Sequence, residues 1–169
     1  VFYQPAEDRV ADMGICISMS GSGCRTFEAH TALQSDFGSP FFALISELHI
    51  NPDARCSRVD LAIDEREGLL DFPTIIDRVQ KNAINSYIKK RTVIQGYDGL
   101  QQGGTTVYIG SPRSDFRIRI YDKAKEHFQK GELGYDEHWI RIELVMRAQN
   151  ADGFCAACAN CDSFGRLAA

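Results

Sequence analysis

Three short stretches of the sequence, residues 58–64, 117–123 and 141–147, place chemistry-bearing side chains at alternate positions. In each stretch one alternate set is apolar, and the other is rich in Arg, Asp, Glu and Tyr. Side chains alternate across a strand, so three strands of this design would present one polar face opposite an apolar one. The polar set comprises Arg58, Asp60, Asp64, Arg117, Arg119, Tyr121, Lys123, Arg141, Glu143 and Arg147.

These side chain types suit cleavage of a phosphodiester. Guanidinium groups bind phosphate bidentately and stay charged. Cations around the Tyr121 hydroxyl would favour its phenolate and make it a better nucleophile. Carboxylates on adjacent strands would bind Mg²⁺ or Mn²⁺, and one of them would also serve as general base. We therefore expect Tyr121 to attack a DNA phosphodiester, which gives a 5′-phosphotyrosyl link and a free 3′ hydroxyl. The expected metal ligands or bases are Asp60, Asp64 and Glu143, named below the carboxylate triad.

Three other interpretations fit the same pattern. An ordinary solvated sheet face also alternates in this way. A non-catalytic domain that binds single-stranded nucleic acid would use the face for base stacking, although such platforms usually carry several aromatic residues. A metal-dependent phosphodiesterase would use water as its nucleophile and would form no covalent adduct.

The elements that must position these residues predict an α+β fold. Strands are expected at 14–20, 24–28, 57–64, 87–95, 105–109, 116–121 and 138–147, with a turn at 21–23. Helices are expected at 41–49 and 71–83, over a turn or two at 123–130, and from residue 152. Regular βαβ alternation is absent, so we expect a mainly antiparallel sheet with helices on one face and the catalytic residues on the other.

The charge of the chain is unevenly distributed. Its 169 residues carry a net charge of −4, yet residues 78–125 include ten basic and three acidic side chains, a local charge of +7. This asymmetry is compatible with a basic surface for DNA on an acidic body, and equally with charges scattered over a solvated surface. Besides Arg117 and Arg141, the expected DNA-binding residues are Lys89, Lys90, Arg91 and Tyr108, and Tyr108 is also a candidate second nucleophile.

Composition also sets limits on location and cysteine chemistry. No apolar run reaches the ~20 residues of a membrane-spanning helix, and no secretion signal is visible, so we expect a cytoplasmic protein with reduced thiols. Cys155, Cys158 and Cys161 recur at helical spacing without a fourth ligand, which favours structural thiols over a metal cluster. Because the sequence starts at Val1 and stops within a helix-like stretch, we expect one nicking domain, residues 1–169, cut from a longer protein at both ends.

Five motifs in series resemble the replication initiation factor family (Rep_trans), which comprises rolling-circle plasmid initiators and relaxases of conjugative elements. They lie, in the family's order, at residues 18–25 (SMSGSGCR), 58–64 (RVDLAID), 104–111 (GTTVYIGS), 119–123 (RIYDK) and 141–143 (RIE).

The resemblance implies a sequence-specific, metal-dependent nickase of the bacterial cytoplasm that initiates rolling-circle replication or conjugative transfer. It implies that Tyr121 is the nucleophile and that Arg119 and Lys123 neutralise the scissile phosphate. The implied partners are an origin hairpin with a single-stranded nick site, a host helicase and a second copy of the chain. Related nucleases bind metal through a His-x-His pair; the four histidines here are isolated, which agrees with carboxylate ligation.

Overall fold

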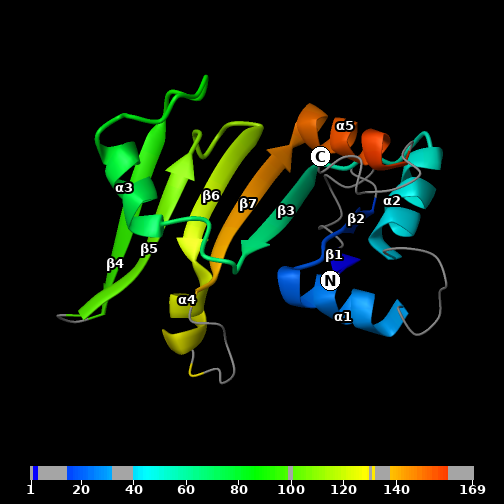
Figure 1. The fold of residues 1–169 in the computed structure, drawn as a ribbon. Helices are drawn as coiled ribbons and strands as arrows, with labels where there is room; N and C mark the ends of the chain where they lie inside the picture. The colour runs from blue at the N-terminus through cyan, green and yellow to red at the C-terminus, as the bar shows by residue number, and fades with distance from the viewer. Residues whose placement is uncertain are drawn as a thin grey trace. The chain divides into compact units, whose positions relative to one another are not determined.

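The polar and apolar faces predicted from the sequence belong to a five-stranded antiparallel sheet (Figure 1). The computed structural model describes residues 2–3, 15–31, 40–98, 101–129, 131 and 138–159. The strand order is β3-β7-β6-β5-β4, and every neighbouring pair is antiparallel. The strands are β3 (Arg58–Glu65), β4 (Arg91–Asp98), β5 (Gln101–Ile109), β6 (Phe116–Asp122) and β7 (Ile140–Arg147). This arrangement confirms the predicted α+β fold.

One helix covers the apolar face of this sheet. Helix α3 (Phe72–Gln80) lies across β4 and β5 (Figure 1), and Phe72 and Val79 pack against a core that includes Val107, Ile120 and Ile140. The helix begins where the Asp71 carboxylate accepts a hydrogen bond from the Thr74 amide at 3.1 Å, an N-cap that satisfies one of the free amides of the first turn. The chemistry-bearing side chains of the strands lie on the opposite face, called here the polar face.

Two further helices flank β6 and β7. Helix α4 (Lys123–Gln129) follows β6 directly, and the amides of Lys123 and Ala124 donate to the Trp139 carbonyl at 2.7 and 3.2 Å. Helix α5 (Ala148–Ala159) follows β7 without a loop, four residues earlier than expected. Two of the three clustered cysteines, Cys155 and Cys158, are buried on α5, while Cys161 lies outside the described residues.

The chain divides into two compact units, residues 55–155 with the sheet and residues 1–54 with 156–169. The second unit contains β1 (Phe2–Tyr3), β2 (Cys16–Ile17), α1 (Gly21–Thr31) and α2 (Pro40–Ile50). The expectation of one domain over residues 1–169 stays a prediction. Among the described residues, no helix has both the length and the apolar composition that crossing a membrane requires.

The prediction of a turn at 21–23 and a returning strand at 24–28 is wrong, because these residues form α1. The Ser20 hydroxyl accepts from the Gly23 amide at 3.2 Å, and the Ser20 carbonyl accepts from the Cys24 amide at 2.8 Å. Ser20 therefore caps a helix, a role in which Ser is favoured. The expected strand at 14–20 is described from residue 15, and within 15–20 Cys16 and Ile17 form a strand that pairs with β1.

Candidate active site

The register of the sheet brings the chemistry-bearing residues of β6 and β7 side by side. Tyr121 on β6 lies opposite Arg141 on β7 and Thr106 on β5. One step along the strands, Arg119 lies opposite Glu143. Side chains directly opposite each other in an antiparallel pair share a face, so all five point to the polar face.

Tyr121 and Glu143 are in direct contact. The Tyr121 hydroxyl donates a hydrogen bond to Glu143 Oε1 at 2.8 Å. The other carboxylate oxygen of Glu143 accepts from the Arg119 guanidinium, whose Cζ lies 5.2 Å from the centre of the Tyr121 ring. Glu143 is buried and Tyr121 is half-buried. The polar face thus brings a tyrosine hydroxyl next to its proton acceptor and a fixed cation.

The acidity of Tyr121 differs from the sequence-based expectation. Burial, the hydrogen bond to Glu143 and the negative charges of Glu143 and Glu126 raise the pKa of Tyr121 above that of a free tyrosine, although Arg141 works in the opposite direction. The expectation that surrounding cations favour the phenolate is therefore wrong. The hydroxyl keeps its proton at neutral pH, and a base must remove it during any attack.

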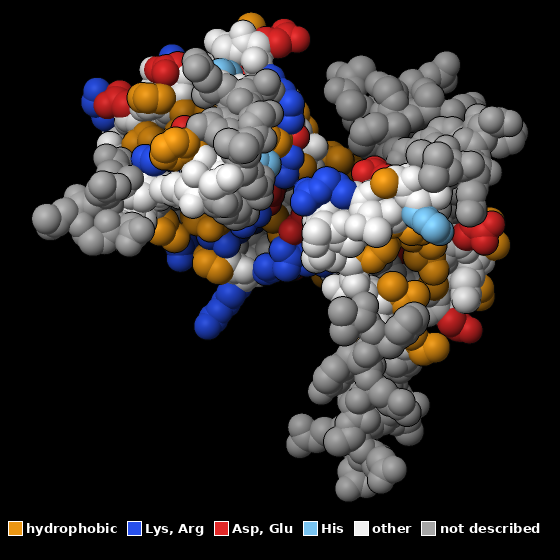
Figure 2. Space-filling view, turned by 90° about the horizontal axis from the view of Figure 1, so that it is seen from below, with side chains coloured by type: hydrophobic (Ala, Val, Ile, Leu, Met, Phe, Trp, Pro, Cys, Tyr) orange, Lys and Arg blue, Asp and Glu red, His pale blue; other side chains and the backbone are white. Residues whose placement is uncertain are grey.

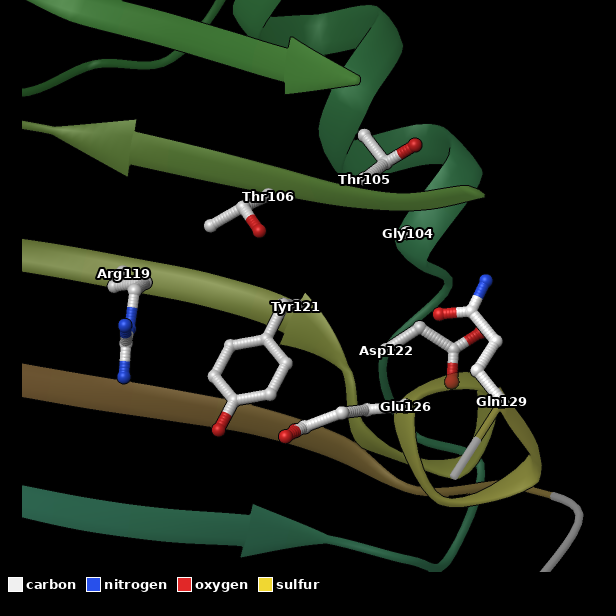
Figure 3. A pocket seen from close by; sticks show the side chains of 8 residues that line it. All are labelled: Gly104, Thr105, Thr106, Arg119, Tyr121, Asp122, Glu126 and Gln129. Atoms are coloured by element: carbon white, nitrogen blue, oxygen red, sulfur yellow. The ribbon is translucent and has the colours of Figure 1, made fainter. Parts of the chain in front are cut away.

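Lys123 and Glu126 extend the site onto α4. Lys123 is buried, and its Nζ lies 5.9 Å from the centre of the Tyr121 ring and 2.7 Å from a carboxylate oxygen of Glu126. Figure 3 shows the Glu126 side chain pointing toward Tyr121. A hollow of about 240 Å³ opens beside them, and its lining is Gly104, Thr105, Thr106, Arg119, Tyr121, Asp122, Glu126 and Gln129 (Figure 3).

Sequence reasoning did not assign a role to Glu126 or Thr106. Glu126 follows Lys123 at helical spacing, and that spacing is the one signal that could have found it. Thr106 shares alternation with Tyr108, but its place beside Tyr121 depends on the β5–β6 register.

The other two members of the carboxylate triad bind arginines. Asp64 forms two hydrogen bonds of 2.6 Å with Arg141. Although burial works in the opposite direction, these bonds hold the pKa of Asp64 below its usual value. Asp60 forms bonds of 2.8 and 2.6 Å with Arg58, its neighbour on the same strand face.

The carboxylate triad does not fit a site for one metal ion in this arrangement. Asp60 and Asp64 are four residues apart on an extended strand, which separates their Cα atoms by about 13 Å. Both oxygens of each triad carboxylate already accept hydrogen bonds from Arg or Tyr donors. In the part of the chain that the structure describes, no three His, Cys, Asp or Glu side chains converge as metal ligands would.

The expected DNA-binding residues fall into two groups. Arg117 lies on the polar face with its Cζ 3.7 Å from the centre of the Tyr108 ring, and Arg141 lies beside Tyr121. Lys89 and Lys90 are exposed in the connection that precedes β4. On the face in view in Figure 2, Lys and Arg side chains lie next to Asp and Glu side chains.

Arg91, the remaining expected DNA-binding residue, lies on the other face of the sheet from Arg117 and Arg141. It pairs in register with Ile109, a core residue, so its side chain points to the helix-covered face. Its guanidinium donates to the Asn82 side chain and, at 2.8 Å, to the Ile84 carbonyl. The strand predicted at 87–95 is observed at Arg91–Asp98. The bonds of Arg91 connect the start of β4 to the segment that follows α3.

Comparisons with known proteins agree with the motif series. Residues 54–165 match the replication initiation factor family, Rep_trans. A protein of Bacillus subtilis (strain 168) named DNA relaxase NicK is 30% identical over 156 residues, which is 89% of this chain and 42% of that protein. A replication initiation protein of Staphylococcus aureus is 29% identical over 97 residues, 57% of this chain and 27% of that protein.

A solved structure has the same fold. The rolling circle replication initiator protein from Geobacillus stearothermophilus superposes with a TM-score of 0.72 at 28% identity, over 89% of this chain and 54% of that one. The chain thus spans about half the length, or less, of the relatives that it matches. The family match includes the whole polar face and the hollow beside Tyr121. This chain belongs to the replication initiation factor family.

Proposed function

We propose that this chain is the nicking domain of an initiator of rolling-circle replication or conjugative transfer, with Tyr121 as its nucleophile. The observation that carries the proposal is the 2.8 Å hydrogen bond from the Tyr121 hydroxyl to Glu143, with the Arg119 guanidinium on the other carboxylate oxygen. A nucleophile, a base within hydrogen-bond reach and a fixed cation are the parts that attack on a phosphodiester needs.

The proposed step is a transesterification. Tyr121 Oη forms a bond to the scissile phosphorus while the bond from phosphorus to the 3′ oxygen breaks. Glu143 accepts the phenolic proton, and the departing 3′ oxygen takes a proton from water. Glu143 then gives its proton to the hydroxide left by that water, so the step consumes no net proton. Arg119 and Lys123 offset the charge that accumulates on the phosphate. Strand rejoining is the reverse step, in which a 3′ hydroxyl attacks the phosphotyrosine.

The family resemblance implies a divalent cation, Mg²⁺ or Mn²⁺, as the electrophilic partner of the phosphate. The carboxylate triad does not fit a single ion, so no step above uses one. The origin hairpin with its single-stranded nick site, the host helicase, a homodimer and a cytoplasmic location are likewise proposals. Arg117, Arg141, Tyr108, Lys89 and Lys90 are the proposed contacts to the DNA strand.

The direct test is trapping of the covalent adduct. Single-stranded oligonucleotides that tile the gene of this protein and its flanks are incubated with the chain and Mg²⁺ or Mn²⁺, and adducts are resolved on denaturing gels. The wild type should form a denaturation-resistant adduct on one cognate oligonucleotide, and Tyr121→Phe should form none. Tyr97→Phe is the matched control, because Tyr97 is an exposed tyrosine on β4.

The outcomes separate the alternatives. Cleavage by Tyr121→Phe at the wild-type rate would refute the proposal and favour water as the nucleophile. Binding without cleavage by the wild type on every oligonucleotide would favour the non-catalytic binding domain. Loss of the adduct in Tyr108→Phe, with the adduct retained in Tyr121→Phe, would transfer the role of nucleophile to Tyr108.

A further inference from the structure

Trp139 is a buried aromatic residue that lies next to the proposed site. It directly precedes β7, and its carbonyl accepts hydrogen bonds from the first two amides of α4. Its side chain is 9% exposed. The core cluster beneath α3, among the described residues, does not include Trp139. The sequence pattern gives it the same alternation as Arg141 and Glu143, which is that of the polar face.

Three cationic side chains surround the indole of Trp139. The Arg66 Cζ lies 4.0 Å from the ring centroid, the Arg141 Cζ 5.5 Å and the Lys123 Nζ 6.0 Å. The His127 ring lies 4.7 Å away at an angle of 36°. Cations within about 6 Å of an indole face are attracted by its quadrupole.

Two of these cations also lie at Tyr121. The Lys123 ammonium is 5.9 Å from the centre of the Tyr121 ring, so it sits at nearly equal distances from Tyr121 and Trp139. Arg141 is the direct cross-strand neighbour of Tyr121. Lys and Arg side chains are long and lose much rotamer freedom when they are fixed, so a rigid buried ring that fixes them before DNA arrives would favour binding of the phosphate.

We propose that Trp139 is a positioning residue that, together with the carboxylates of Glu126 and Asp64, holds Lys123 and Arg141 beside Tyr121, ready to meet the scissile phosphate and its neighbour. This inference rests on the proposed function. The role is indirect, since the indole need not touch the reacting atoms. It explains why a large aromatic residue is buried among cations at the junction of β7 and α4.

Replacement of Trp139 by Leu and by Phe tests the inference. We expect Trp139→Leu to slow single-turnover adduct formation by about tenfold to a hundredfold, and Trp139→Phe to recover most of the rate because it keeps a ring. Phe72→Leu is the matched control, because it removes a buried ring from the opposite face of the sheet. Equal rates for Trp139→Leu and the wild type, or equal losses for the Leu and Phe variants, would overturn the inference.

A binding measurement tests the same inference without any chemistry. In a Tyr121→Phe background, the affinity for a single-stranded oligothymidylate is measured against salt concentration. Each phosphate contact contributes about 0.7 to the slope for single strands, so losing one or two positioned cations should make the slope shallower by about 0.7 to 1.4 in Trp139→Leu. An unchanged slope would refute the positioning role.

The fluorescence emission of Trp139 gives a further test, because Trp139 is the single tryptophan of the sequence. Saturating oligothymidylate should change the emission of the wild type, because a phosphate bound by Lys123 and Arg141 adds negative charge beside the indole. This readout serves if Trp139→Leu fails to fold. Constant emission at saturation would overturn the inference. Both binding readouts remain valid if no adduct is ever found, so failure of the proposed function and failure of this inference are distinguishable.

Discussion

Replacement of Glu143 by Gln removes the charge that accepts the Tyr121 proton and keeps the shape of the side chain. The amide oxygen can still accept the hydrogen bond that Tyr121 now donates at 2.8 Å, so the geometry should persist. A positioned general base contributes about 10² to 10⁴ in rate, or about 3–5 kcal/mol at 1.36 kcal/mol per tenfold. We therefore predict that Glu143→Gln forms the DNA adduct about 10²- to 10⁴-fold more slowly at neutral pH.

The pH profile adds a second test of the same residue. Glu143 is one cause of the raised pKa of Tyr121, after burial, so its loss should lower that pKa. Without a base, the rate should follow the phenolate fraction and rise about tenfold per pH unit below the pKa. Single-turnover adduct formation between pH 6 and 9 should thus rise steeply for Glu143→Gln and much less for the wild type.

Loss of the Glu143 charge also leaves the partly buried Arg119 without its ion-pair partner. A cost to stability of about 1–3 kcal/mol is expected and must be measured by urea denaturation, so that rates are compared only among folded protein. Asp77→Asn is the matched control, since Asp77 on α3 forms an exposed ion pair with Lys81, the residue that follows this helix. It should change neither the rate nor, beyond about 1 kcal/mol, the stability. A wild-type rate and pH profile in Glu143→Gln would refute the role of Glu143 as base.

Three further predictions concern the fold around the site. Chelation of divalent cations with EDTA should leave the melting temperature unchanged, because the carboxylate triad is already paired with donors of the protein; a clear fall would show that an ion holds these carboxylates together. Burial opposes ionisation of Glu65, but hydrogen bonds from His138 and from three backbone amides lower the pKa of Glu65 to about 2. The stability that the ionised carboxylate contributes is therefore present above pH 4.5 and is lost as the pH falls toward 2. Thermal melting should show the gap between wild type and Glu65→Gln closing over that window, and a constant gap would contradict this. Gly110 and Gly68 both have positive φ, so replacing either by Ala should destabilise the protein, by ~1 kcal/mol at Gly68. Gly110→Ala should cost more, because of these two glycines only Gly110 would bring a Cβ against backbone, the Phe116 carbonyl at 3.0 Å. Equal losses of stability in urea denaturation would disprove the steric argument.

The strands of the sheet were predictable because their alternation is local. The predicted strands at 57–64, 116–121 and 138–147 each show a period of two, and the observed strands differ from them by at most two residues at either end. The turn chemistry at 21–23 was misleading. Gly-Ser-Gly is compatible with both a turn and a capped helix, and the choice depends on whether residues 24–28 find a strand partner, which lies beyond the local sequence.

The sequence by itself determined which residue types share a face and that Tyr121 is the nucleophile candidate, because side-chain direction along a strand follows from backbone geometry alone. Only the tertiary structure decided which carboxylate meets that hydroxyl. Glu143 reaches it because β7 lies between β3 and β6, whereas Asp60 and Asp64 are one strand further away and bind Arg58 and Arg141. Strand order and register are set by packing of the whole sheet. They place Tyr121 where burial and the Glu143 carboxylate, rather than the neighbouring cations, dominate the pKa of its hydroxyl.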